Sequence, residues 1–175
     1  MKKAVVLASA ALFAAGVMAA EPMIVKGTSE LSLAGNLDRD TIALGVGYGY
    51  FIMDGLEVGA DVAGSYQDLG DSSEVKTVGG DIFAQYNFKI DAPVVPFVGV
   101  AGGFRYMKVE VRDFENDDDT AFVGEGQLGV KYFVADNVAI ALYGFYDLAD
   151  KEVFTNKDEM EKYDFGARLG MNTYF

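Results

Sequence analysis

The chain of 175 residues contains no cysteine, no histidine and no tryptophan, and only three prolines. Without cysteine there is no disulfide framework, no thiolate nucleophile and no cysteine-ligated zinc or iron–sulfur site. Without histidine the commonest general base is missing, which excludes Ser-His-Asp and Cys-His catalysis within this chain. Basic residues are also scarce, 14 against 27 acidic ones, and the formal net charge is −13. Nucleic-acid binding needs a basic surface and is therefore not expected.

Hydrophobic residues nevertheless make up 51% of the chain, too many for a disordered acidic polymer. Glycine is abundant, with 21 residues, and the aromatic residues comprise 10 tyrosines and 13 phenylalanines. This composition favours strands and turns, and the length is that of one domain.

The first residues have the layout of a secretory signal peptide. Lys2 and Lys3 precede an unbroken run of apolar or small residues over positions 4–20. We predict a signal peptide over residues 1–19, cut after Ala19, with a cut after Ala20 as the alternative, and a single barrel domain over residues 20–175. A transmembrane anchor fits less well, because the run is rich in alanine and short for a span of about 20 residues.

In the rest of the chain, large apolar residues alternate with small or polar residues at a period of two, which is the pattern of a β-strand. In residues 41–52, for example, large apolar residues occupy one face, and glycine, alanine and threonine occupy the other. Eight segments, an even number, show this pattern: 28–36, 41–52, 56–66, 77–88, 96–107, 122–133, 138–148 and 163–175.

The connections between these segments differ in length in a regular way. Tight turns are expected at 51–55, 89–95 and 134–137, and long acidic loops at 108–121 and 149–162. Short turns on one side and longer loops on the other are typical of outer-membrane barrels. The pattern therefore predicts an all-β fold, an eight-stranded antiparallel up-and-down transmembrane β-barrel.

The charged residues of the predicted strands share the face that carries small residues. These residues are Glu30, Glu57, Asp61, Asp81, Arg105, Glu125, Lys131, Asp164 and Arg168. A membrane barrel keeps polar groups inside and apolar groups toward lipid, so we predict an interior charge network. Unpaired interior ions are costly, and Arg168 is expected to pair with Glu30, Glu57 or Glu125. The network is either a plug of ion pairs, which a narrow eight-stranded barrel favours, or part of an ion path.

Aromatic residues gather near both ends of the predicted strands, as in the interfacial girdles of membrane barrels. Near the short turns they are Tyr50, Phe51, Tyr86, Phe88, Tyr132, Phe133 and Phe175. Near the long loops they are Tyr66, Phe104, Tyr106, Phe122, Tyr146 and Tyr163. A water-soluble ligand-binding barrel is the alternative, but it would place the large apolar face inside and the charged face in water.

Two motifs with possible chemistry fail on their context. Residues 124–129 spell G-x-G-x-x-G, but a strand follows where dinucleotide binding requires a helix. The acidic residues between 110 and 119 do not fit a calcium loop, because Asp118 and Gly124 stand where glycine and glutamate are needed. We therefore predict no catalytic residues, no metal, no cofactor and no enzyme activity.

The chain resembles the small bacterial outer-membrane β-barrels, of the OmpA-like and OmpX-like eight-stranded kind. The segments that carry the resemblance are 131–139, 95–103 and the final strand 169–175. The resemblance implies location in the cell outer membrane with both termini in the periplasm, among outer-membrane lipid and lipopolysaccharide. It also implies that the C-terminal Phe175 is an assembly signal for the barrel-assembly machinery, although Thr173 departs from the usual aromatic or apolar residue.

The predicted function is that of an integral outer-membrane protein with a structural or surface-interaction role. Its acidic loops would face outward and offer a site for an extracellular ligand. The alternative function is a narrow pore for small solutes.

Overall fold

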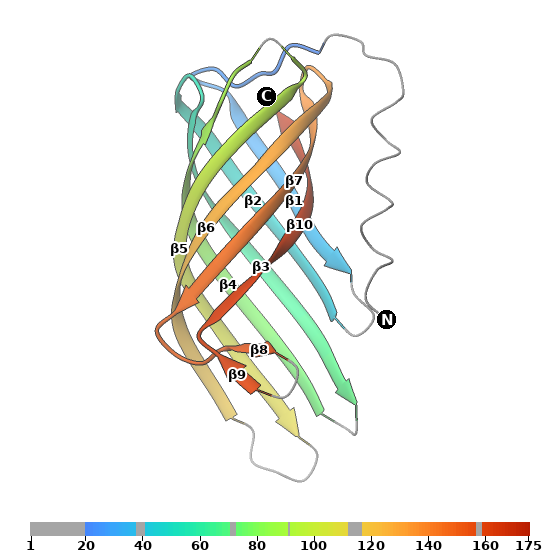
Figure 1. Ribbon diagram of the computed structural model, residues 1–175, viewed down its shortest axis with the longest axis vertical. Coiled ribbons are helices and arrows are strands. Elements are labelled where there is room, and N and C mark those ends of the chain that lie inside the picture. The colour runs from blue at the N-terminus through green and yellow to red at the C-terminus, as the bar shows by residue number, and fades with distance from the viewer. Residues whose placement is uncertain (1–19, 38–40, 71–72, 91, 112–116, 157–158) are drawn as a thin grey trace.

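The computed structural model describes residues 20–37, 41–70, 73–90, 92–111, 117–156 and 159–175. The predicted signal peptide, 1–19, lies outside the described residues. Eight long strands form a closed antiparallel barrel, and a small two-stranded sheet lies near one end (Figure 1). The strands are β1 (Ser29–Leu37), β2 (Thr41–Met53), β3 (Leu56–Gly70), β4 (Ser73–Asn87), β5 (Val94–Val111), β6 (Asp117–Ala135), β7 (Val138–Ala149), β8 (Phe154–Asn156), β9 (Glu159–Glu161) and β10 (Tyr163–Tyr174). The described residues contain no helix that is long and apolar enough to cross a membrane.

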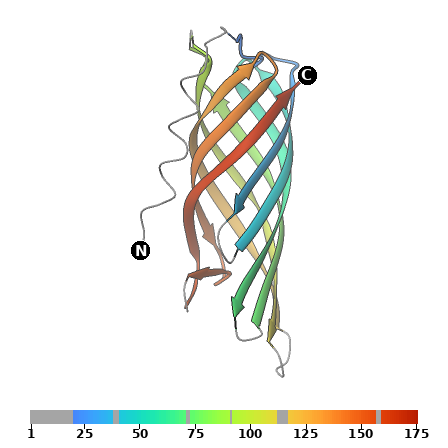
Figure 2. The same ribbon diagram turned by 90° about the vertical axis from the view of Figure 1, so that its right-hand side faces the viewer.

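The barrel closes by pairing its first and last long strands. The order around the barrel is β1-β10-β7-β6-β5-β4-β3-β2, and each of these strands is antiparallel to its neighbours. At the seam, β1 and β10 pair from Glu30↔Tyr174 to Gly35↔Leu169. Figure 2 shows the strands crossing the barrel at a steep tilt. The predicted eight-stranded barrel is confirmed.

The outward face of the barrel is apolar. Leu142 on β7 is 42% exposed, whereas the side chain of its neighbour Ala141 points inward and is buried. The same alternation exposes a large apolar side chain near the middle of each strand: Leu33, Leu44, Val62, Ile82, Val100, Leu128, Leu142 and Leu169. Such a belt would be a liability in water, but it matches the hydrocarbon layer of a membrane.

The two ends of the barrel differ. At one end β2 and β3 are joined through Asp54 and Gly55, and β6 and β7 through Asp136 and Asn137. Gly55 has a φ of 77°, in the left-handed region that glycine adopts without a steric penalty. A Cβ atom there would also lie 2.6 Å from the carbonyl oxygen of Asn87. We call this the short-turn end; it is at the top of Figure 1.

At the opposite end, which we call the loop end, β3 to β6 extend beyond β1 and β2 (Figure 1). The predicted long loop at 108–121 is wrong in extent, because β5 continues to Val111 and β6 begins at Asp117. The backbones of Lys108 and Asp118 pair directly. The strand pairing therefore continues into the segment that was expected to be a loop because of its acidic residues. In the second predicted loop, 149–162, the hairpin β8–β9 forms.

Two aromatic residues assigned to the short-turn girdle lie inside the barrel. Phe51 and Phe133 are 0% and 1% exposed. Each follows an aromatic residue in the same strand, and successive side chains of a strand point to opposite faces. Phe51 is therefore inward, while Tyr50 is outward and 42% exposed. The six aromatic residues predicted for the other girdle are all exposed.

Residues 20–28 close the short-turn end of the barrel. This position was not predicted from the sequence. Ile24 is completely buried in a cluster of inward side chains from five strands: Phe51, Val95, Phe133, Ala139 and Tyr174. The segment is held by hydrogen bonds from Glu21 N–H to Asp136 Oδ1 (2.9 Å) and from Lys26 N–H to Asp54 Oδ1 (2.8 Å). Gly55 N–H donates to the Ile24 carbonyl at 3.0 Å. We call this segment with its cluster the Ile24 stopper.

The facing of β7 leads to a first prediction. Leu142→Arg places a charge in the apolar belt and should lower the free energy of unfolding in lipid vesicles by about 2–4 kcal/mol. Ala141→Ser, one residue away on the inner face, is the control and should change it much less. Urea titrations of both variants in vesicles measure the difference. Equal losses would contradict the assignment of the two faces.

Candidate functional site in the barrel interior

Lys131 on β6 is a charged residue that is almost completely buried, 1% exposed. Its Nζ lies 2.6 Å from Oε2 of Glu30 on β1 and 3.4 Å from Oε2 of Glu57 on β3. The same nitrogen lies 5.5 Å and 5.7 Å from the ring centroids of Phe97 and Tyr174. An ammonium group without water needs such partners, because its desolvation is costly.

Neutral side chains complete this layer. Gln85 Nε2 donates to Glu57 Oε2 at 2.5 Å, and Asn87 Nδ2 donates to the same oxygen at 3.4 Å. Asn172 Nδ2 donates to Glu30 Oε1. The polar groups of this cluster come from β1, β3, β4, β6 and β10. Their hydrogen bonds and ion pairs connect these strands across the lumen. We call this cluster the Lys131 layer.

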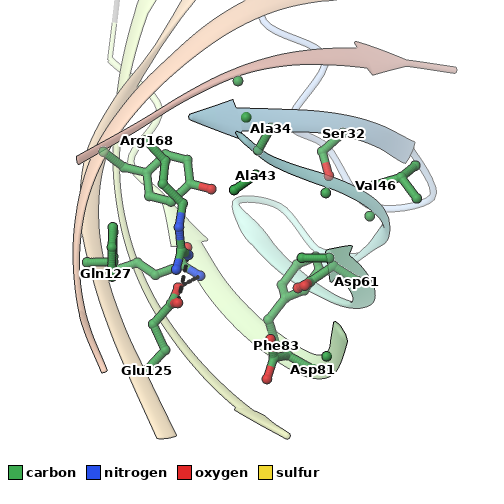
Figure 3. A pocket seen from close by; sticks show the side chains of 18 of the residues that line it. Ser32, Ala34, Ala43, Val46, Asp61, Asp81, Phe83, Glu125, Gln127 and Arg168 are labelled. Carbon is green, nitrogen blue, oxygen red and sulfur yellow. Dashed lines mark hydrogen bonds and ion pairs between the residues drawn. The ribbon is translucent and has the colours of Figure 1, made fainter. Parts of the chain in front are cut away.

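A second level of charges lies toward the loop end. Arg105 on β5 forms a two-pronged contact with Asp81 on β4, with N–O distances of 2.8 Å and 2.7 Å. Arg168 on β10 lies 2.7 Å from Glu125 Oε2 and 3.5 Å from Asp147 Oδ2. Its guanidinium carbon is also 3.7 Å from the ring centroid of Phe145. Arg105 is therefore held beside β4, and Arg168 beside Glu125, as Figure 3 shows for Arg168.

The predicted interior residues divide into two groups. Seven take part in ion pairs: Glu30, Glu57, Asp81, Arg105, Glu125, Lys131 and Arg168. Asp61 and Asp164 take part in no ion pair between described residues, although both line the interior cavity. Asp164 is exposed at the loop end, where its Oδ1 accepts the N–H of Phe165 at 2.8 Å.

Asp147 is not among the residues predicted for the interior charge network. It is 2% exposed on the inner face of β7, and the strand register places it directly opposite Glu125 and Asp164. Asp147 is separated by an even number of positions from the buried Ala139 and Ala141 on the same strand. Because side chains alternate along a strand, this spacing identifies the side chain of Asp147 as inward. The aromatic residues that contact Lys131 were also missed, because Phe97 and Tyr174 had been given no interior role.

The interior contains a cavity of about 420 Å³. Most of its lining consists of inward side chains of the barrel strands, and Val153 and Phe154, which follow β7, line part of it at the loop end. Toward the short-turn end the barrel is filled first by the Lys131 layer and then by the Ile24 stopper. Among the described residues, no group of three or more acidic side chains is arranged to hold a metal ion.

A closed barrel with an apolar belt outside and paired charges inside is a transmembrane β-barrel. The sequence profile of the family described as "Outer membrane protein beta-barrel domain" matches residues 5–172. The chain belongs to this family of outer-membrane proteins. The resemblance inferred from the sequence is thereby confirmed, and so is the coarse assignment to the outer membrane.

Several solved structures are similar in fold. The N-terminal β-barrel domain of Pseudomonas aeruginosa OprF has a TM-score of 0.59 and 15% identity, covering 86% of this chain and 98% of that one. Neisserial surface protein A has a TM-score of 0.61 and 17% identity, covering 85% and 95%. Ail, the attachment invasion locus protein of Yersinia pestis, has a TM-score of 0.57 and 15% identity, covering 86% and 100%. No curated protein matches the sequence.

The Lys131 layer leads to a second prediction. Lys131→Met leaves the carboxylates of Glu30 and Glu57 buried without their cation, so it should lower the free energy of unfolding by about 3–5 kcal/mol. A second change, Glu57→Gln, should recover part of that loss. Lys89→Met removes the same charge from an exposed turn and serves as the control. Urea midpoints in vesicles measure all three, and an unchanged midpoint for Lys131→Met would show that the layer is not stabilising.

Proposed function

We propose that this protein is a non-conducting outer-membrane barrel that presents its loop end to the exterior as an interaction surface. The observation that carries the proposal is the filling of the short-turn end. Lys131, 1% exposed, spans to β1 and β3, and Ile24 is completely buried beyond it. An eight-stranded barrel has room for side chains but hardly more, so these two obstructions leave the loop end as the functional surface.

The chemistry of the loop end favours a positively charged partner. Asp150, Glu152 and Asp164 are exposed there, and residues 110–119 add further acidic side chains in the sequence. Ail of Yersinia pestis has been crystallised with the heparin analogue sucrose octasulfate, a polyanion. With a net charge of −13, this chain is suited to the opposite kind of ligand: a basic protein surface, or cations that bridge it to lipopolysaccharide.

The same proposal includes the route to the membrane. Residues 1–19 act as a signal peptide, both termini of the mature chain remain in the periplasm, and the barrel-assembly machinery reads the last strand. Phe175 is suited to that role, because it is 65% exposed on the outer face at the rim of the short-turn end. The lipid and lipopolysaccharide of the outer membrane then surround the apolar belt.

A narrow pore for small solutes is the second candidate function. The cavity of about 420 Å³ with charged walls favours it, because it already forms part of a polar route through the barrel. The two functions differ in one measurable property, which is steady ion conductance.

A third prediction separates these functions. In planar bilayers the wild-type protein should give conductance near background, because the Lys131 layer and the Ile24 stopper obstruct the lumen in series. Arg168→Met should stay at background, since it changes only the level above both obstructions. An open porin inserted under the same conditions is the positive control. A steady channel in the wild type or in Arg168→Met would replace the proposal with the pore.

A fourth prediction concerns orientation. Trypsin added to intact cells should cut after Lys151 or Lys162, which are exposed at the loop end. It should spare Lys26 and Lys89, which are equally exposed at the short-turn end. Permeabilised cells provide the control, because Lys26 and Lys89 then become accessible. Cutting at Lys26 or Lys89 in intact cells, with the loop end protected, would invert the topology.

A further inference from the structure

We propose that the interior cavity binds a small organic cation with two amino groups, of the diamine or polyamine class. The cavity of about 420 Å³ lies within the range of small-molecule sites. Its lining combines acidic, aromatic and small side chains, and the glycine-rich walls of β1 and β2 leave space beside them. This site is independent of any partner at the loop end.

The cavity has more carboxylates than cations. Six carboxylates line it, Glu30, Asp61, Asp81, Glu125, Asp147 and Asp164, together with three cations, Arg105, Lys131 and Arg168. Lys131 pairs with Glu30, Arg105 with Asp81, and Arg168 mainly with Glu125. Asp61 and Asp164 have no ion-pair partner among the described residues, and Asp147 shares Arg168 with Glu125.

The strand register explains why this surplus is costly. Asp61 on β3 lies directly opposite Asp81 on β4, and Asp81 is the carboxylate with which Arg105 forms an ion pair among the described residues. Glu125 on β6 lies directly opposite Asp147 on β7, and they share Arg168. Like charges in directly opposite positions of a sheet destabilise it. A bound cation beside either pair would remove that repulsion.

The two acidic pairs lie on different sides of the same cavity. In the order of strands around the barrel, β3 and β7 are diametrically opposite. Figure 3 shows Asp61 and Asp81 on one side, and Glu125 with Arg168 on the other. A ligand with a positive charge at each end therefore fits this arrangement better than a single ion.

Asp147 provides a second, independent observation that points to a ligand. Its side chain is 3% exposed and contributes to the cavity lining, yet its Oδ1 has no hydrogen-bond partner in the described part of the chain. Buried polar atoms without a partner are rare and call for an explanation, such as a bound ligand. An ammonium group donates up to three hydrogen bonds and carries the complementary charge.

The aromatic walls favour an organic cation over a bare metal ion. Phe83, Tyr143 and Phe145 line the cavity, and the guanidinium of Arg168 already lies over the ring of Phe145. Ring faces attract cations, and the alkyl chain of a diamine can pack against them. Divalent metals instead require several oxygen ligands around one point, and no such group of acidic residues occurs among those described.

Isothermal titration calorimetry of the folded protein in detergent tests the proposal, with 1,5-diaminopentane as the probe. The uncharged 1,5-pentanediol and magnesium chloride are the comparison ligands. The variants are Asp61→Asn, which removes one charge of the site, and Ala34→Phe, which fills the cavity. Ala34 pairs with Gly45 and Gly170, so a phenyl group has room to enter. Glu21→Gln removes an exposed acidic charge outside the cavity lining, at the short-turn end, and is the matched control.

The expected result is saturable binding of the diamine to wild type and Glu21→Gln, with affinity at least tenfold lower in Asp61→Asn and Ala34→Phe. Asp61→Asn should at the same time raise the urea midpoint without ligand, because it relieves the repulsion with Asp81. A lower affinity for the diamine together with a higher urea midpoint shows that Asp61→Asn has lost binding and not its fold. The absence of saturable binding to wild type would overturn the proposal. Equal affinity in Asp61→Asn or Ala34→Phe, or equal binding of the diol or magnesium, would also overturn it.

Discussion

The structure depends on one constraint, which is that backbone N–H and C=O groups in a hydrocarbon layer must bond to each other. No water is available there, so an open sheet edge would leave these groups unpaired at a cost of several kcal/mol each. The seam between β1 and β10 meets this constraint by joining the first strand to the last. Once the sheet is closed, alternate side chains must face either lipid or the lumen, and the apolar belt and the charged interior both follow from this.

The narrow closed lumen makes pairing of ions obligatory, and the protein meets that demand differently at two levels. In the Lys131 layer, acids and amides from several strands surround one ammonium group, which suits a permanent cross-link. At the level of Arg105 and Arg168, two cations serve a larger number of carboxylates. The first arrangement is suited to stability and the second to recognition. Strands β4, β6 and β10 carry residues of both levels.

The fold was predictable from the sequence because the period of two is local. Alternation in residues 41–52 or 138–148 identifies both a strand and its faces without knowledge of the partners. The same rule, applied strictly, would have placed Phe51 and Phe133 inside, since adjacent aromatic residues cannot both face lipid. The continued strands beyond residue 107 were missed because acidic composition was given more weight than alternation.

The pairing of interior charges was less predictable, because it depends on distances across the lumen. Lys131 and Glu30 are 101 residues apart in sequence and meet only through the closed barrel. Arg168 has Glu125 among its expected partners and also contacts Asp147, which had not been assigned to the network. Residues 20–28 show no alternation, so no periodic signal could indicate that they return to the barrel.

The Ile24 stopper has a consequence for the order of assembly. The cavity that receives Ile24 is built from Phe51 on β2, Val95 on β5, Phe133 on β6, Ala139 on β7 and Tyr174 on β10. These strands surround one point only after the seam has formed, so the binding place for Ile24 does not exist in a partly assembled sheet. Residues 20–28 can therefore reach their buried position only after the barrel has closed.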